Sequence, residues 1–153
     1  MVTVVFHFTD WDDYPGGDLP KSTVSVWIHD VKAFGADKLI MIDKTSFRIG
    51  QYYQHSDDTI LFERYDSLEE CLEKYPDENW VFVEIDEKSV MLNEFEHPEN
   101  PIYVVGADFS RILNESNIEP KHWVKIPMLH HRPLYAHVAM MTVLYDRMIR
   151  LNN

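Results

Sequence analysis

The first 43 residues alternate between strand and helix patterns, and this alternation restricts the possible folds more than any other feature of the chain. Thr3–Phe8 is a run of β-branched and aromatic residues typical of a buried strand. A helix capped by Ser22 or Thr23 is expected to end at Gly35, a residue type suited to the position after a helix. Asp37–Asp43 is again a strand pattern. A strand, a helix and a strand in so short a stretch predict a βαβ unit and a largely parallel sheet.

The same alternation continues along the chain. Four further strands are predicted, at Thr59–Arg64, Asn79–Ile85, Pro101–Gly106 and His122–Ile126. Helices are predicted at Leu68–Tyr75, between a Ser67 cap and Pro76, and at Phe109–Asn114. The stretches 44–58 and 86–100 receive no element. We expect residues 1–153 to form a single α/β domain, with a mainly parallel sheet of about six strands and helices on both faces.

A long helix is predicted to begin near Pro133 and to reach the end of the chain. Its apolar residues fall on two faces, one with Leu134, Val138, Met141, Tyr145 and Met148, and the other with Ala136, Met140, Val143 and Ile149. A surface helix usually has one apolar sector of about 100°. We therefore expect one face to join the core and the other to pack against a second subunit, which makes a homodimer through this helix.

The charge is unevenly distributed. The formal net charge is −12, but residues 1–106 hold 22 acidic and 8 basic side chains, whereas residues 107–153 hold 4 acidic and 6 basic ones. A polyanion would be repelled by most of this surface and could approach only the C-terminal loops. The alternative is that the acidic surface serves solubility alone.

The sequence also indicates where in the cell the protein is expected. No apolar run is long enough to span a bilayer, and the N-terminus lacks a signal-peptide pattern, so a soluble, cytoplasmic protein without membrane contact is expected. The one cysteine, Cys71, lies in a helical pattern between acidic neighbours, which do not activate a thiol. We interpret Cys71 as structural.

The ends of the predicted strands are where function is expected, since ligands of parallel α/β sheets bind at the carboxyl ends of the strands. Three such ends stand out: Glu84–Asp86, Val104–Asp108 and Lys125–Met128. Gly106 allows a close backbone approach, and Asp108 adds a carboxylate beside it.

Taken together and in order, four segments resemble the motifs of the SPOUT superfamily, the SpoU/TrmH-like RNA methyltransferases. They are AFGADKLIMID at 33–43, VVGAD at 104–108, IPM at 126–128 and HVAMMTVLYDRM at 137–148. The resemblance implies a C-terminal trefoil knot, S-adenosyl-L-methionine as cofactor, a homodimer built on the terminal helices, and an RNA substrate such as tRNA. It implies methylation of a ribose 2′-hydroxyl.

The resemblance also implies roles for particular residues. Cofactor contacts, mainly through the backbone, are expected from Glu84, Val105, Gly106, Ala107, Ile126, Met128 and Leu134. Apart from the resemblance, the basic and histidine character of the C-terminal segment predicts a patch for phosphate or substrate, made by Arg111, Lys125, His130, His131 and Arg132. Transfer to a hydroxyl needs alignment and the removal of one proton, and the catalytic candidates for these tasks are His29, Asp108 and Tyr135.

Two of the motifs depart from the family pattern. Thr23 and His29 stand where the family usually has an asparagine and an arginine, and Pro133, Leu134 and Tyr135 stand where its last motif reads Ser-Leu-Asn. His29 could act as the base, since its unperturbed pKa is near neutral, or it could simply pair with a neighbouring acid. The alternative function is therefore a degenerate SPOUT dimer that binds the cofactor or a protein partner without methyl transfer.

Two groups of residues are of a type that can bind metals, but no metal site is predicted. His130 and His131 are adjacent, so their side chains point apart, and they lack the spacing of zinc ligands. The aspartates at 10, 12, 13 and 18 could bind Mg²⁺ in a nuclease or phosphotransferase, although such a run is usually a solvated turn.

Overall fold

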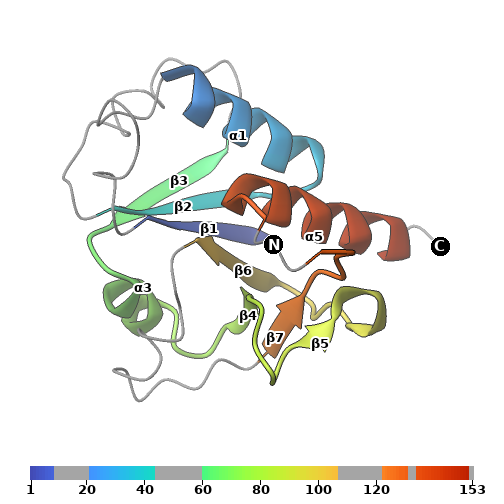
Figure 1. The fold of residues 1–153 in the computed structure, drawn as a ribbon. Coiled ribbons are helices and arrows are strands. Elements are labelled where there is room, and N and C mark those ends of the chain that lie inside the picture. Colours follow the sequence, from blue (N-terminus) through green and yellow to red (C-terminus); the bar gives the residue numbers. More distant parts are fainter. Residues whose placement is uncertain (9–20, 44–59, 107–121, 131–133, 152–153) are drawn as a thin grey trace.

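A computed structural model describes residues 1–8, 21–43, 60–106, 122–130 and 134–151. In this part of the chain, seven strands form one sheet of order β3-β2-β1-β6-β4-β7-β5, and every pairing is parallel (Figure 1). The strands are β1 Thr3–Phe8, β2 Lys38–Asp43, β3 Leu61–Tyr65, β4 Asn79–Val83, β5 Val90–Met91, β6 Pro101–Gly106 and β7 His122–Lys125.

The predicted α/β class and parallel sheet are confirmed, and the six predicted strands all exist. The seventh, β5, lies in the stretch 86–100 to which the sequence assigned no element. It contains two residues, too few for an alternating pattern, and it forms only because β7 offers a free edge at Val124 and Lys125. The expected trefoil knot and the helix Phe109–Asn114 involve residues outside the described ranges, so both stay predictions.

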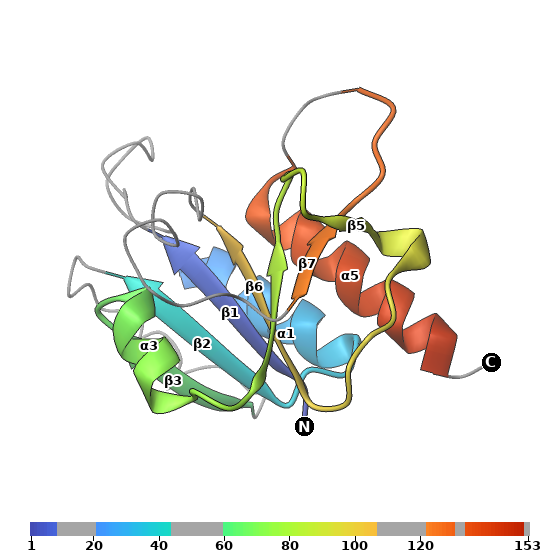
Figure 2. The ribbon, with the colours of Figure 1, turned by 90° about the horizontal axis from the view of Figure 1, so that it is seen from below.

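Helices cover both faces of the sheet (Figure 2). Helices α1 (Lys21–Ala33) and α5 (Ala136–Leu151) lie side by side on one face, with the 3-10 helix η2 (Leu92–Glu94) packed into the same core. Helix α3 (Leu68–Lys74) covers the other face and is the one helix placed there among the described residues. Alternate residues of the central strands point to opposite faces of the sheet. Val4 and Phe6 lie in the core beneath α1 and α5, and Val5 lies in the core beneath α3.

Helix α3 agrees with its sequence signals. The Ser67 hydroxyl accepts a hydrogen bond from the Glu70 N–H at 3.1 Å, which is the predicted cap. Cys71 is fully buried, and burial, aided by the carboxylates of Glu63 and Glu70, raises the pKa of its thiol to about 12. A thiol in that environment stays protonated at neutral pH, so the structural interpretation of Cys71 is confirmed.

The predicted starts of α1 and α5 were wrong. Helix α1 already includes Lys21, so Ser22 and Thr23 lie inside its first turn and cannot cap it from outside. Helix α5 begins at Ala136, three residues after Pro133, and its first backbone hydrogen bond runs from the Ala139 N–H to the Tyr135 carbonyl at 3.0 Å. The apolar pattern alone does not mark such boundaries, because side-chain periodicity extends past the residues that are hydrogen-bonded.

The two apolar faces of α5 have different environments. Met140, Val143 and Leu144 are buried against the sheet and α1. Val138 and Ile149, each 38% exposed, and Tyr145, 50% exposed, share the opposite side. The predicted face of Ala136, Met140, Val143 and Ile149 is therefore divided: Met140 and Val143 point into the core, whereas Ile149 shares the outward side with Val138, which it follows by 11 residues, close to three full turns. None of the helices in the described part of the chain has the length and apolar character needed to cross a bilayer.

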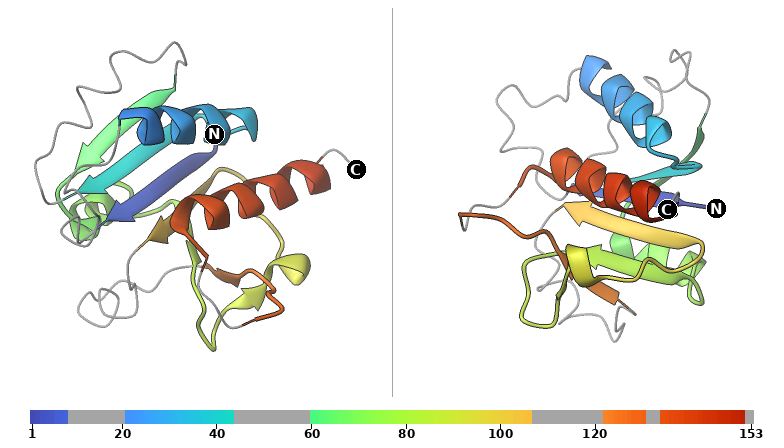
Figure 3. Two further views of the ribbon diagram at one scale, coloured as in Figure 1. Left: turned by 45° about the horizontal axis from the view of Figure 1, so that its top comes forward. Right: turned by 90° about the vertical axis from the view of Figure 1, so that its right-hand side faces the viewer.

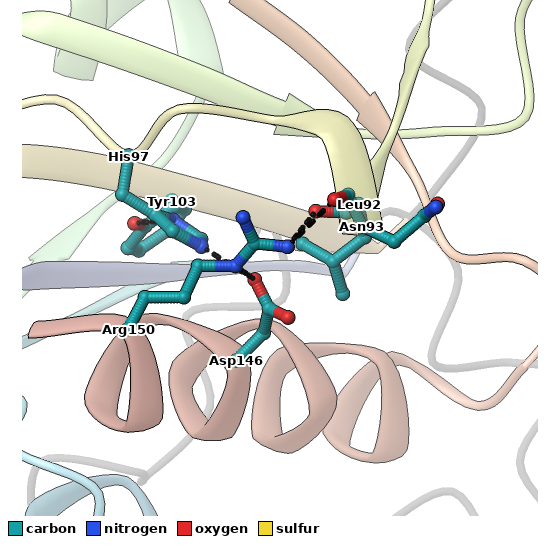
Figure 4. A network of polar contacts seen from close by, with 6 residues as sticks. All are labelled: Leu92, Asn93, His97, Tyr103, Asp146 and Arg150. Carbon is teal, nitrogen blue, oxygen red and sulfur yellow. Dashed lines mark hydrogen bonds and ion pairs between the residues drawn. The ribbon is translucent and has the colours of Figure 1, made fainter. Parts of the chain in front are cut away.

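A buried polar network fastens α5 to the segment before β6 (Figure 4). The two ring nitrogens of His97 contact the Tyr103 hydroxyl at 2.6 Å and the Asp146 carboxylate at 2.9 Å. Arg150 bonds the same carboxylate at 2.7 Å and reaches the carbonyl oxygens of the first two residues of η2 at 3.3 and 2.8 Å. These contacts fit a neutral imidazole that accepts from the tyrosine and donates to the aspartate.

This network should make stability depend on pH. Burial lowers the pKa of His97 below its ordinary value of 6.5, and the nearby Asp146 offsets this only in part. The unfolded chain therefore takes up a proton more readily, so the contribution of His97 to stability is complete above pH 6.5 and is lost as the pH falls through the folded-state pKa.

We expect the free energy of unfolding to fall between about pH 7.5 and about pH 5.5, and to fall less in His97→Gln, in urea titrations of both proteins. His97→Ala should in addition lose about 1–3 kcal/mol at neutral pH, because the Tyr103 hydroxyl and the Asp146 carboxylate both lose their hydrogen bond to the imidazole. Equal pH slopes in the wild type and His97→Gln would contradict this assignment.

Candidate functional site

The carboxyl ends of β1, β6, β4 and β7 meet at one edge of the sheet, since these four strands are consecutive neighbours and parallel. Figure 2 shows the arrowheads of β1, β6 and β7 and the start of α5 at this common edge. Three of the predicted cofactor residues lie here: Gly106 ends β6, Glu84 follows β4, and Ile126 follows β7. Val105, predicted with them, is buried in the core just below the edge.

The pairing continues past the end of β4. Val83 lies opposite Val124, and the Glu84 N–H then donates to the Val124 carbonyl at 2.9 Å. The Glu84 carboxylate, which is half-buried, accepts from the Ile85 N–H at 2.8 Å, and the Ser89 hydroxyl donates to the Glu84 carbonyl at 2.8 Å. Residues 84–89 thus form a hydrogen-bonded loop that holds a carboxylate at the edge of the sheet. Carboxylates at strand ends bind ribose hydroxyls in other parallel α/β folds.

Gly106 is placed by its own conformation. Its φ is +131°, a value that side chains with a Cβ rarely adopt, and a Cβ there would lie 1.9 Å from the His7 carbonyl oxygen of β1. A residue other than glycine would therefore push β6 away from β1. The structure gives Gly106 a packing role, and its contact with a cofactor stays a prediction.

The chain after β7 supplies an apolar and then an exposed segment. Ile126 packs against the core and Met128 is half-buried, whereas Leu129 is 98% exposed and His130 is exposed. Half-buried apolar groups beside strand-end backbone suit the faces of an adenosine.

Of the predicted substrate residues, Lys125 is the half-buried last residue of β7 and His130 lies in the exposed part of the loop that follows it. Arg111, His131 and Arg132, together with Ala107 and Asp108, lie outside the described ranges.

The predicted base is not oriented toward this edge. His29 is exposed on α1, while its neighbours Trp27, Ile28 and Val31 point into the core. It therefore lies on the solvent side of the helix, and the structure does not bring it together with Glu84 within one chain. The role of His29 stays a prediction.

The sequence missed an aromatic row that reaches this edge. Phe6, Trp27, His137 and Tyr135 are stacked one after another, with ring centroids 5.0, 6.0 and 6.4 Å apart and interplanar angles of 11°, 19° and 17°. The rings come from β1, α1, α5 and the residue before α5. No local pattern could have revealed it, because the contacts join residues far apart in the chain. Tyr135, a predicted catalytic residue, is the last ring of the row. Leu134, a predicted cofactor residue, comes just before Tyr135 in the sequence and is 39% exposed.

Among the residues that the structure describes, no group of three histidine, cysteine, aspartate or glutamate side chains is arranged to hold a metal ion. The Asp10–Asp18 loop and His131 are not part of those residues, so the two metal hypotheses stay untested.

The sequence and the structure differ in what they resemble among known proteins. The sequence matches no known protein family and no characterised protein. The structure, in contrast, resembles many solved structures over nearly its whole length. The TrmH/SpoU tRNA modifying enzyme of A. aeolicus superposes with a TM-score of 0.69 and 19% identity, covering 98% of this chain and 75% of the other.

Two further structures are similarly close. One, solved for the 2-OH methylation of C/U34 on tRNA, gives a TM-score of 0.68 at 17% identity and covers 99% of this chain and 97% of its own. The SpoU methyltransferase AviRb of Streptomyces viridochromogenes, in complex with AdoMet, gives 0.65 at 18% identity, and this chain spans 58% of its length. The chain therefore has the fold of the SpoU/TrmH RNA methyltransferases, as its motifs predicted.

The two glycines that the structure describes, Gly35 and Gly106, both have positive φ and offer a matched test of the edge geometry. Gly106→Ala combines the backbone strain with the clash against His7, and we expect it to lower the free energy of unfolding by more than about 2 kcal/mol. Gly35→Ala, at φ +88° with open space around it, should cost only about 1 kcal/mol. Urea unfolding of both variants measures the difference, and equal losses would show that β6 does not approach β1 so closely.

Proposed function

We propose that this chain is an S-adenosyl-L-methionine-dependent RNA methyltransferase that acts on a ribose 2′-hydroxyl. The observation that supports this most is the fold match over 98–99% of the chain to RNA-modifying SpoU/TrmH proteins, one of them in complex with AdoMet. It is supported further by the sheet edge, where the predicted cofactor residues Glu84, Gly106 and Ile126 lie at the carboxyl ends of three neighbouring strands.

Methyl transfer from S-adenosyl-L-methionine to a hydroxyl requires mainly that the protein align the two reacting groups. The cofactor supplies a methyl group on a sulfonium; the chain must hold it, present the ribose hydroxyl in line, and take one proton from that hydroxyl. In this proposal backbone groups of Glu84, Val105, Gly106, Ala107, Ile126, Met128 and Leu134 hold the cofactor. His29, Asp108 and Tyr135 are the candidates for handling the proton and the substrate.

The proposed RNA contacts lie in the least acidic part of the chain. Lys125, His130, His131, Arg132 and Arg111 are assigned to the substrate, which is proposed to be tRNA or a similar RNA. Only six Lys and Arg side chains are present in residues 107–153, so phosphate attraction alone is modest. A cytoplasmic location, expected from the sequence, also stays a prediction.

Two measurements test this function. We expect S-adenosyl-L-methionine and S-adenosylhomocysteine to bind the purified protein in calorimetry, and the methyl label to enter unfractionated tRNA. Methylation of the 2′-oxygen removes the nucleophile of alkaline hydrolysis, so the label should appear in alkali-resistant dinucleotides. Label in alkali-sensitive mononucleotides would contradict ribose methylation, and binding of neither ligand would contradict the function as a whole.

The alternative function is a SPOUT-fold dimer that binds the cofactor or a protein partner without methyl transfer. The departures at Thr23 and His29 favour this alternative, and the same assay distinguishes it from the proposed enzyme. If His29 is the base, His29→Ala should lower the transfer rate by about 10²–10⁴-fold while cofactor affinity is unchanged. Cofactor binding with no transfer to any RNA by the wild type would support the alternative.

We also propose that the chain forms a homodimer through α5. The support is the outward apolar face of Val138, Tyr145 and Ile149, which a monomer would leave in water. Val138→Glu and Ile149→Glu should convert a dimer to a monomer in sedimentation, because a carboxylate buried in an apolar interface is not solvated. Leu61→Glu, an exposed apolar residue on the distant edge strand β3, is the matched control and should leave the mass unchanged.

A further inference from the structure

The aromatic row runs from the centre of the protein to its surface. Phe6 is fully buried, Trp27 is 7% exposed, His137 is half-buried and Tyr135 is 80% exposed. Each ring lies within 20° of parallel to the next. The last ring is therefore backed by a stack anchored in the core, and most of the surface of Tyr135 is exposed to solvent.

The backbone beneath Tyr135 is also fixed. Its carbonyl accepts the first hydrogen bond of α5, from the Ala139 N–H at 3.0 Å, and His137 of the same helix start stacks against its ring. A tyrosine has only two rotatable side-chain bonds, so little entropy is lost when such a ring binds a partner. Figure 3 shows the start of α5 beside the carboxyl end of β6, the edge that carries the candidate site.

An exposed planar ring is suited to stack with another planar ring. The chain carries a net charge of −12, so phosphate contacts are repelled by most of its surface. Stacking on bases is insensitive to that charge and tolerates any base, because every base has a π face. An acidic RNA-binding protein therefore gains most from this kind of contact.

We propose that Tyr135 is the platform on which a nucleobase of the bound RNA stacks, beside the site of methyl transfer. This rests on the proposed function and gives Tyr135 a positioning role in place of a chemical one. The adenine of the cofactor offers the same chemistry. The RNA is favoured because a cofactor pocket usually encloses about 70–90% of its ligand, whereas Tyr135 is 80% exposed.

Three variants separate the ring from its hydroxyl: Tyr135→Ala, Tyr135→Phe and Tyr135→Trp. Affinity for unfractionated tRNA is measured by fluorescence anisotropy at several salt concentrations, and affinity for S-adenosylhomocysteine by calorimetry. Tyr135→Ala should weaken tRNA binding by about five- to a hundredfold at every salt concentration, leaving the salt slope unchanged. Tyr135→Phe and Tyr135→Trp should stay within about threefold of the wild type, since both keep a stacking face.

A control variant and a second readout keep the test specific. Leu129→Ala removes the most exposed apolar side chain of the neighbouring loop, without removing a ring, and should not change tRNA affinity. Cofactor affinity should be unchanged in all four variants. In the methyl-transfer assay Tyr135→Ala should raise KM for tRNA more than it lowers kcat, because the ring contributes binding rather than proton transfer.

Several results would overturn the inference. Unchanged tRNA affinity in Tyr135→Ala would show that the ring holds no base. A loss of S-adenosylhomocysteine affinity in that variant would assign the stack to the adenine of the cofactor. Equal loss of methyl transfer in Tyr135→Phe and Tyr135→Ala would assign the chemistry to the hydroxyl. If the wild type binds neither S-adenosyl-L-methionine nor S-adenosylhomocysteine, the proposed function is wrong. If the wild type methylates tRNA and Tyr135→Ala binds tRNA equally well, only this inference is wrong.

Discussion

The close parallel pairing of β1 with β6 is the constraint on which the rest of the structure depends. These two strands form the centre of the sheet, and they meet at Gly106, where the backbone of β6 leaves no room for a Cβ beside His7. Their alternating side chains fill both cores, which in turn carry α1 and α5 on one face and α3 on the other. The strand order outward from this pair brings four carboxyl ends to one edge.

A site built at such an edge is made mainly of backbone. Glu84 continues the hydrogen bonding of β4 to β7, and Ile126 anchors the next loop in the core, so the positions of main-chain groups follow from the sheet itself. Contacts of this kind tolerate changes of side chain, which explains how a fold can persist at 17–19% identity while residues in two of the motifs differ. It also means that cofactor binding and catalysis can be lost separately. We expect the departures at Thr23 and His29 to affect catalysis more than cofactor binding.

The sequence predicted those features that depend on neighbouring residues. Runs such as Val4–Phe6 identify strands, and Ser67 before an amphipathic segment identifies a cap. It failed where distant contacts decide the outcome. Strand β5 exists only against β7, the start of α5 is set by hydrogen bonding rather than periodicity, and the stack from Phe6 to Tyr135 joins three elements. The residue pattern alone identified the strand ends but not the ligand that would bind there. The ligand was predicted from the order of the motifs along the chain.

The most direct test of the account is amide hydrogen exchange with and without S-adenosylhomocysteine. If the ligand binds at the shared edge through main-chain groups, exchange should slow at residues 84–85, at Gly106 and at Ile126 and Met128, while α3 on the opposite face is unaffected. Slowing confined to α3 or to β3, with no change at the ends of β4, β6 and β7, would contradict the claim that this edge is the functional site.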